Sequence, residues 1–457
     1  MRQKDSSSKN QLDMTTGSLL IKQLRFLVPL ILTGQLQLLY GAFDIIVVGK
    51  FATPTALPAV GSTSSLVNLL LNVFIGLSVG TNVVISLYFG AKDKENMQKT
   101  LHTSLATALI SGIFLVVVGI FATPSILKLM NTPIDVIDQS ILYLRILSIG
   151  MPFNLIYNFA AAALRAIGDT KKPLIFLSIS GVINVVLNLV FVIIFHLDVA
   201  GVAIATIISQ GISVVLILTY MSRCEDGIKF SITQLRIHKE HFYKIVRIGL
   251  PAGIQGSFFS LSNVLIQSSI NGFGSIAMAG NTASMNLESF IFNAMNSVHQ
   301  SAVTVAGQNL GAKKLLRVRK SLYINMLLAT VIGVIMCAIF YLLNDPLIRF
   351  YSDDANAIEI GLTRLNFFCS MYFICGIMDT ITGFMRGLGR SVVPMIISLL
   401  GVCVFRVIWV FAVFPSWNTL TSLYFSYPIS WLISIVALLI YYYFWIRKDL
   451  LNRDETL

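Results

Sequence analysis

Long apolar stretches recur along the entire chain, and this recurrence limits the possible folds more than any other feature of the sequence. Twelve such stretches, each of about 20 residues, are separated by short polar segments. They show no strict alternation of apolar and polar residues, so they fit spanning helices and not the strands of a barrel. The sequence therefore predicts an all-α polytopic membrane protein with twelve transmembrane helices. The stretches begin near Phe26, Ala59, Leu101, Gln139, Leu174, Gly201, Ile248, Ile276, Ser321, Ile358, Val392 and Thr419.

The composition agrees with this fold class. Hydrophobic residues make up 56% of the 457 residues and charged residues only 12%, whereas a soluble domain carries about 25% charged residues. This excludes an ordinary soluble enzyme, a nucleic-acid-binding module and a disordered chain. The five cysteines form no CxxC motif, and we expect them to pack. The N-terminal segment up to Ser18 is polar and lacks the apolar core of a signal peptide, so we expect the first apolar stretch to be retained as a helix.

Lysine and arginine gather in alternate loops, which accounts for the net charge of +12. They lie in the N-terminal segment, in every second loop, in the polar segment at the midpoint and in the C-terminal tail. The opposite side carries only Lys50, Lys128 and Arg349. The positive-inside rule then predicts a multi-pass protein of the cell (inner or plasma) membrane with both termini in the cytoplasm.

The two halves of the chain resemble each other, and two pairs of matching segments have the same offset in sequence. LRAIGDTKKP (164–173) corresponds to MRGLGRSVVP (385–394), and Gly90-Ala91-Lys92 corresponds to Gly311-Ala312-Lys313. Each half contains an even number of spans, so both enter the membrane from the same side and the repeat is parallel. Two matched six-helix bundles are the usual geometry for rocking-type alternating access, which favours a transporter.

These patterns predict that the chain is organised in three parts. Residues 1–222 form an N-lobe with spans 1 to 6, residues 223–247 form a cytoplasmic inter-lobe loop, and residues 248–457 form a C-lobe with spans 7 to 12.

One group of polar residues lies at membrane depth in the first half. Asp44 is deep in the first span, where a charged side chain costs at least about 2.5–3.5 kcal/mol, and Tyr40 lies one turn before it. Asn184 and Asn188 are one turn apart in the fifth span, and Thr206 is in the sixth. This oxygen-rich set predicts a site for a monovalent cation or for a carboxyl group that gains and loses a proton. The alternative is that each Asn caps backbone or joins helices.

A second set of residues is a weaker candidate for a substrate cavity. Methionine beside asparagine suits a surface that accepts varied ligands, and the acids could place negative charge on a cavity wall. The alternatives are ordinary helix packing and neutralisation of the acids by Arg145, Arg364 or Arg406. The set consists of Asn68, Asn72, Met285, Glu288, Asn293, Met295 and Asp379.

The sequence offers no catalytic constellation. It has no phosphate-binding loop and no visible nucleophile–base arrangement, so we expect no enzyme and no cofactor. The HxxH of His238 and His241 lies in the basic midpoint loop without an evident third ligand, and we interpret it as part of a solvated loop.

Taken together, these residues resemble the multidrug and toxic compound extrusion (MATE) family over residues 20–446. The resemblance rests on the parallel repeat, on Pro29, Tyr40 and Asp44 in the first span, on the Asn pair, on Ala205-Thr206 and on the repeated RxxG…P segment. It implies an antiporter that exports organic, often cationic, compounds in exchange for H⁺ or Na⁺, and hence a role in antibiotic resistance.

The resemblance also assigns roles to particular positions. It implies a cation site at Asp44, Asn184, Asn188 and Thr206 with Tyr40 nearby, and a hinge of the first helix at Pro29, which removes a backbone donor. The acids that one branch of the family has in spans 7 and 10 are replaced here near Phe259 and Cys375. A cation site in the N-lobe alone is therefore expected, in a monomer whose partners are the bilayer and small organic cations, without nucleic acid.

Two other functions remain open at this point. A lipid-linked oligosaccharide or polysaccharide flippase of the same superfamily would need a large, arginine-rich cavity for a pyrophosphate, whereas the candidate residues include three acids. A channel or receptor without coupled exchange is disfavoured by the internal repeat and by Asp44 with its two asparagines.

Overall fold

The computed structural model describes residues 11–130, 132–224 and 227–455, and the side chains of these except 57, 62, 64–66, 68–70 and 452–455. The described chain is helical and contains no strand, which confirms the expected fold class. The α-helices are α1 (Leu19–Phe51), α2 (Ala56–Gly90), α3 (Lys94–Leu129), α4 (Ile134–Ala166), α5 (Lys171–Leu189), α6 (Asp198–Ser222), α7 (Lys239–Asn271), α8 (Ser275–Gly311), α9 (Leu315–Leu342), α10 (Asn344–Arg349), α11 (Ala355–Gly387), α12 (Val392–Ser398), α13 (Phe405–Ile408), α14 (Leu420–Tyr441) and α15 (Arg447–Glu455).

Several helices continue through short π-helical turns. These turns are η1 (Val190–Ile194), η3 (Leu399–Val404), η4 (Trp409–Val413) and η5 (Tyr442–Ile446), and a short 3₁₀ turn, η2 (Ile232–Gln234), lies in the inter-lobe loop. Because the π turns extend α5, α12, α13 and α14 without a break, the last two spans of the chain are each built from more than one helix.

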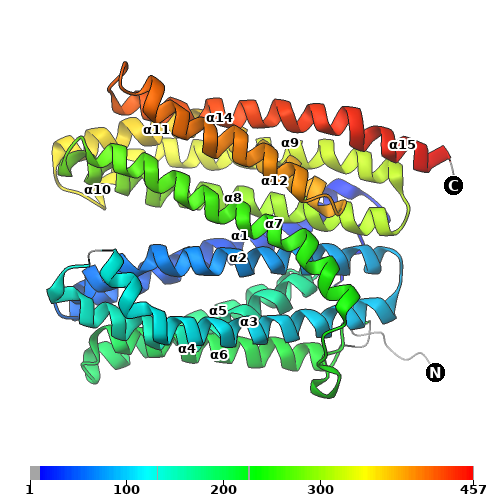
Figure 1. Ribbon diagram of the computed structural model, residues 1–457, viewed down its shortest axis with the longest axis horizontal. Helices are drawn as coiled ribbons and strands as arrows, with labels where there is room; N and C mark the ends of the chain where they lie inside the picture. Colours follow the sequence, from blue (N-terminus) through cyan, green and yellow to red (C-terminus); the bar gives the residue numbers. More distant parts are fainter. Residues whose placement is uncertain (1–10, 131, 225–226, 456–457) are drawn as a thin grey trace. The chain divides into compact units, whose positions relative to one another are not determined.

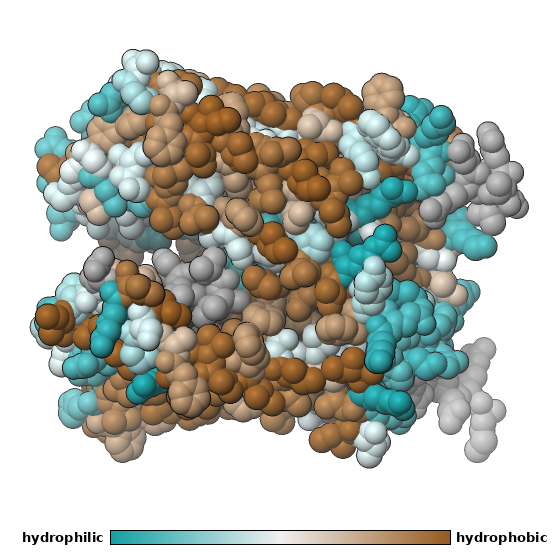
Figure 2. All heavy atoms as spheres, in the orientation of Figure 1, coloured by the Kyte–Doolittle hydropathy of each residue, from teal (hydrophilic) through white to brown (hydrophobic). Residues whose placement is uncertain are grey.

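The number of long helical segments agrees with the twelve expected spans. Within the described residues, ten segments are long and apolar enough to cross a membrane. The remaining two, α7 with 33 residues and α8 with 37, are equally long but more polar. Figure 2 shows hydrophobic side chains along the middle of the helices and hydrophilic side chains toward their ends. This is the distribution expected of a multi-pass membrane protein.

The chain forms two compact units. Among the described residues, unit 1 consists of residues 11–13 and 28–253, and unit 2 consists of residues 14–27 and 254–455. In each unit the helices run alongside one another (Figure 1). The boundary between the units falls inside α1, after Leu27, and inside α7, after Gly253. The described part of the predicted inter-lobe loop, together with residues 248–253 of the predicted C-lobe, therefore belongs to unit 1.

Each unit has one principal core. In unit 1 the largest cluster surrounds α4, whose residues from Phe159 to Leu164 are almost completely buried. In unit 2 the largest cluster surrounds α11, including Phe368 and Phe384. Because α4 and α11 provide the fourth spans of their halves, the two cores occupy corresponding elements of the repeat.

The backbone repeats the sequence repeat. Lys92 and Lys313, which correspond in the two halves, both adopt the left-handed conformation, with φ of 57° and 56°. Gly168 and Gly389, which also correspond, have φ of 86° and 80°. Each of these residues follows the end of a long helix, where a left-handed residue allows the chain to turn sharply. The matching turns show that the two halves use the same local geometry to connect their helices.

Glycines bring α2 and α7 into close approach within unit 1. A Cβ atom built on Gly76 would lie 2.2 Å from the backbone nitrogen of Gly253, and one built on Gly80 would lie 2.3 Å from the carbonyl oxygen of Ile245. Any larger residue at these positions would push the two helices apart. Close contact through glycine is a common way for membrane helices to pack, because it maximises van der Waals contact between backbones.

Candidate functional site

The structure brings together the polar residues that the sequence singled out in the first half. Asp44 on α1 accepts a hydrogen bond from the side-chain amide of Asn188 on α5, with the two atoms 2.5 Å apart. The same Asn188 nitrogen lies 3.2 Å from Oδ1 of Asn184, one turn earlier. The Asn184 amide nitrogen in turn lies 3.5 Å from the hydroxyl of Thr206 on α6. Four of the five predicted site residues thus form one chain of contacts inside unit 1.

The site has two features that suit a small cation. Asp44 is half-buried, and among the described residues no lysine or arginine forms an ion pair with it. Asn188 is completely buried, and its Oδ1 atom has no hydrogen-bond donor among the described residues. A buried acceptor without a donor costs free energy unless a donor or a cation satisfies it. The oxygens of Asp44 and Asn188 are of the type that H⁺ or Na⁺ can neutralise or coordinate.

Tyr40 lies near this site but is held by different contacts. Its hydroxyl donates a hydrogen bond to the carbonyl oxygen of Ser178 on α5, at 3.4 Å. Its ring lies against Gly181, where a Cβ atom would come within 1.9 Å of the ring. Gly181 is therefore required for the packing of α1 on α5 at this level. The sequence did not single out Gly181, because nothing in the local pattern shows which residue of another helix faces it.

Tyr143 on α4 is a further neighbour of Asp44 that sequence reasoning missed. Its phenol interacts electrostatically with the Asp44 carboxylate. The ring also packs on the hydrophobic cluster that includes Val47 and Val202. A single tyrosine in an apolar span gives no signal of its own, so only the packing of α4 beside α1 could identify it.

The remaining candidates of the first half are less well defined. Asn72 is half-buried on α2. Asn68 lies outside the residues whose side chains are described. Pro29 lies within α1, just after the boundary between the units, and its carbonyl oxygen accepts a hydrogen bond from the Thr33 hydroxyl at 2.7 Å. The role of Pro29 as a hinge stays a prediction.

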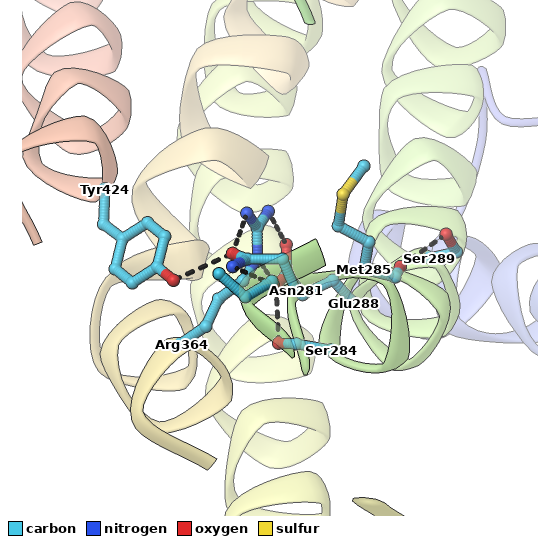
Figure 3. A network of polar contacts seen from close by, with 8 residues as sticks. Asn281, Ser284, Met285, Glu288, Ser289, Arg364 and Tyr424 are labelled. Carbon is cyan, nitrogen blue, oxygen red and sulfur yellow. Dashed lines mark hydrogen bonds and ion pairs between the residues drawn. The ribbon is translucent and has the colours of Figure 1, made fainter. Parts of the chain in front are cut away.

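Glu288, a candidate for the substrate cavity, is instead part of a closed network inside unit 2 (Figure 3). Arg364 on α11 holds its carboxylate with two hydrogen bonds, of 2.7 and 3.1 Å. Ser284 donates a third at 2.8 Å. Arg364 also donates to Oδ1 of Asn281, which accepts from the hydroxyl of Tyr424 on α14. The neutralisation of Glu288 by Arg364, one of the alternatives weighed from the sequence, is what the structure shows.

The other residues of this set on α8 differ in their surroundings. Met295 is completely buried and packs against Gly333 of α9 and Gly376 of α11. Its place is in the core, so it offers no open surface to a ligand. Met285 and Asn293 are half-buried. The spacing of polar and apolar residues on α8 could not separate these cases, because most faces of this helix are covered by protein.

Asp379 lies on α11 near a second arginine. It is half-buried and interacts electrostatically with Arg386, although the two side chains do not form an ion pair. Arg386 donates instead to Gln255 on α7, at 2.8 Å, and lies 3.4 Å from His299. Its Nε atom is buried without a partner among the described residues. Arg386 and Gln255 were not among the candidates.

Comparison with known proteins identifies the family. The MatE family model matches this chain twice, over residues 29–190 and over residues 251–411. The starts of the two matches are related by nearly the same offset as the matching segments of the sequence, and the double match confirms the expected parallel repeat.

Relatives of this chain match over nearly its whole length. Two probable multidrug resistance proteins of Bacillus subtilis (strain 168), YoeA and YpnP, are 28% and 27% identical to it. YoeA matches over 93% of this chain and 94% of its own length, and YpnP over 94% and 96%. The multidrug export protein MepA of Staphylococcus saprophyticus is 24% identical over 85% of this chain and 86% of its own.

Solved structures share the fold. One is an outward-facing multidrug resistance MATE family transporter of the MOP superfamily, with a TM-score of 0.89, 19% identity and coverage of 99% of this chain and 100% of that one. Another is a MOP superfamily transporter of Pyrococcus furiosus described as having a binding pocket of reverse polarity, with a TM-score of 0.87, 20% identity and coverage of 98% and 100%. The repeated match of the family model, together with the helical fold and the length of the shared segments, shows that this chain belongs to the MatE family of membrane transporters.

Proposed function

We propose that this protein is a multidrug efflux antiporter that exports organic, chiefly cationic, compounds in exchange for H⁺ or Na⁺ by rocking-type alternating access. Family membership and the drug-export functions of its relatives support export of drugs. One observation supports the coupled exchange: the membrane-embedded carboxylate of Asp44 accepts a hydrogen bond from Asn188 and forms no ion pair with a basic side chain among the described residues.

The coupling follows from electrostatics. An unpaired carboxylate in a low-dielectric environment favours states in which a proton or a cation neutralises it. Asp44 can therefore bind either the coupling ion or the positive group of a substrate, and competition between the two links their movements. Each monovalent cation that enters the cell gains about 2.3 kcal/mol per 100 mV of membrane potential. If the ion is a proton, each unit of pH difference adds about 1.4 kcal/mol. One or two ions suffice for tenfold to a few-hundredfold accumulation.

The test compares Asp44→Asn with the parent in cells at equal expression, with ethidium efflux as the readout. Asp353→Asn serves as the matched control because Asp353 is an exposed acid outside the helices. We expect Asp44→Asn to lose most of the energised efflux and the control to keep it. If Asp44→Asn supports as much efflux as the parent, the proposed coupling role of Asp44 is wrong.

A second experiment separates the coupling ions. Purified protein is reconstituted in liposomes, and Na⁺ and proton gradients are imposed one at a time while a fluorescent cation is followed. Transport that saturates and follows one gradient identifies the ion, whereas a flux that ignores both gradients supports a channel. A flippase of lipid-linked sugars is not favoured, since the relatives are multidrug proteins.

The arrangement in the membrane belongs to the same proposal. Alternation of basic loops supports cytoplasmic termini in the cell membrane. We further propose that the protein acts as a monomer and that bending of α1 at Pro29 accompanies the exchange of ions at Asp44, since proline removes one helical hydrogen bond.

A further inference from the structure

The segment that precedes α1 is fastened to the turn between α8 and α9, and both belong to unit 2. The backbone amide of Met14 donates a hydrogen bond to Oε1 of Gln308 at 2.9 Å. The side-chain amide of Asn309 donates to the carbonyl oxygen of Met14 at 3.3 Å. Met14, Gln308 and Asn309 are all completely buried. A residue whose backbone donor and acceptor are both satisfied by buried side chains is part of the packed protein.

Two cations of the same turn hold the carbonyl oxygens of this segment. Lys314 donates to the carbonyl oxygen of Thr15 at 2.8 Å. The guanidinium of Arg317 donates to the carbonyl oxygens of residues 14, 16 and 17 at 2.9, 3.3 and 3.0 Å, and its Nε atom donates to Oδ1 of Asn309 at 3.1 Å. Hydrogen bonds from charged donors are stronger than neutral ones. The N-terminal clamp consists of residues 14–17 with Gln308, Asn309, Lys314 and Arg317.

The corresponding turn of the first half shows that the turn itself does not require these residues. The two turns share their backbone geometry, with φ of 57° at Lys92 and 56° at Lys313. Asp93 caps α3 by accepting a hydrogen bond from the Asn96 amide, whereas Lys314 at the same position makes no side-chain cap bond among the described residues. The α8–α9 turn thus lacks a helix cap where its lysine holds the N-terminal segment. At the offset that relates Lys92 to Lys313, the clamp residues Gln308, Asn309, Lys314 and Arg317 correspond to Leu87, Tyr88, Asp93 and Asn96.

The start of α7 is fastened within unit 1 in a matching place. The backbone amide of His238 donates to the hydroxyl of Thr103 on α3 at 3.1 Å. Nζ of Lys244 donates to the hydroxyl of Tyr88 on α2 at 2.9 Å. Helices α1 and α7 are the two that pass from one unit into the other. Each of them is therefore held near its start by the unit in which it begins, before its proline.

We propose that the N-terminal clamp is an anchor that keeps the first part of α1 fixed to unit 2 throughout transport, with Arg317 as its positioning residue. This inference rests on the proposed function, in which α1 bends at Pro29. The clamp fixes the residues that precede the bend, so the movement passes to the part of α1 that carries Asp44 and belongs to unit 1. Without the clamp, the start of α1 moves instead, and less of the bending reaches Asp44.

The experiment measures ethidium efflux per expressed molecule over a range of ethidium concentrations. Arg317→Ala is compared with the matched control Lys320→Ala, which removes an exposed positive charge one turn further along α9. We expect Arg317→Ala to lose most of its maximal rate at an unchanged half-saturation concentration, because Arg317 is no part of the Asp44 site, and the control to match the parent. A merely structural role would lower the amount of protein but leave the rate per molecule unchanged, and this result would overturn the anchor.

A cross-link distinguishes an anchor that stays closed from a contact that has to open. A short bis-maleimide joins the two exposed positions of the variant T16C/K314C. We expect the cross-link to leave efflux by this variant unchanged and to restore efflux to T16C/K314C/R317A. The parent treated with the same reagent is the control, since its five cysteines are buried. Loss of efflux on cross-linking, or no rescue of the triple variant, would overturn the anchor.

Amide exchange of the purified full chain in detergent tests the clamp without transport. Loss of one hydrogen bond to a charged group shifts an equilibrium by about tenfold or more, so we expect Arg317→Ala to speed exchange of the Met14 amide at least about tenfold. Unchanged exchange would overturn the clamp. The proposed function fails if Asp44→Asn keeps the efflux of the parent, whereas the anchor fails if Arg317→Ala keeps it, so the two failures are distinct.

Discussion

The network of Glu288 and Arg364 gives a quantitative test of how unit 2 is held together. Both side chains are nearly inaccessible, with 7% and 2% of their surface exposed. Arg364→Met removes three hydrogen bonds and leaves a buried carboxylate that retains Ser284 as a partner. Loss of one member of a buried ion pair costs about 3–5 kcal/mol. We therefore expect the unfolding equilibrium to shift by two to four powers of ten, since about 1.4 kcal/mol is tenfold.

The double variant E288L/R364M separates the effect of the unpaired charge from that of lost packing. Because it removes both charges, we expect it to regain most of the stability and to lie within about 1 kcal/mol of the parent. The assay is the free energy of unfolding in mixed micelles, followed by tryptophan fluorescence and analysed as a double-mutant cycle. Equal destabilisation by the single and double variants would refute the reasoning.

The exposed pair of Arg349 and Asp345 provides the control. It has a similar distance of 2.8 Å between nitrogen and oxygen, but its side chains are 60% and 50% exposed. Ion pairs in water contribute less than about 1 kcal/mol. Arg349→Met should therefore change the unfolding free energy little, and a loss as large as that of Arg364→Met would show that burial is not the cause.

Three further predictions concern unit 1 and the N-terminal segment. Gly181→Val should displace the Tyr40 ring, since even a Cβ atom would lie within 1.9 Å of it, and should abolish ethidium efflux at unchanged expression; retained efflux would contradict this. The carboxylate of Asp93 accepts hydrogen bonds from Asn96, which lowers the pKa of Asp93. At pH values above the ordinary pKa of Asp, this cap should stabilise the first turn of α3, and the stabilisation should be lost as the pH falls through the lowered pKa of Asp93. Asp93→Ala should therefore cost about 0.5–2 kcal/mol at neutral pH. The measurement is amide exchange near Asn96, which should become faster. Arg317 donates to the carbonyl oxygens of residues 14, 16 and 17, so Arg317→Ala should make this segment more sensitive to protease, and unchanged cleavage would count against the contact.

The sequence predicted the helical fold because the length of an apolar stretch directly reflects the thickness of a bilayer. It also found the members of the Asp44 site, since carboxylate and amide groups in a span are conspicuous and residues one turn apart share a helix face. Asp44, Asn184, Asn188 and Thr206 are brought together by the packing of α1, α5 and α6. Their function as a coupling site stays a prediction.

The sequence could not identify partners on other helices. Three arginines were possible counter-charges for the acids, and only the packing of α8 on α11 shows that Arg364 binds Glu288 from a distant part of the chain. Met295 could not be assigned to the core because the covered face of α8 depends on its neighbours. Tyr143 and Gly181 escaped notice for the same reason, since their importance comes from what faces them.

The course of α1 and α7 has a mechanical consequence. Each helix passes from one unit into the other close to a proline, Pro29 in α1 and Pro251 in α7. Proline cannot donate a backbone hydrogen bond, so each helix is easiest to deform at this crossing. The two prolines lie at corresponding positions of the repeat, so we expect the backbone to bend at these two short places if the proposed rocking takes place. Bending confined to these places leaves the cores around α4 and α11 intact.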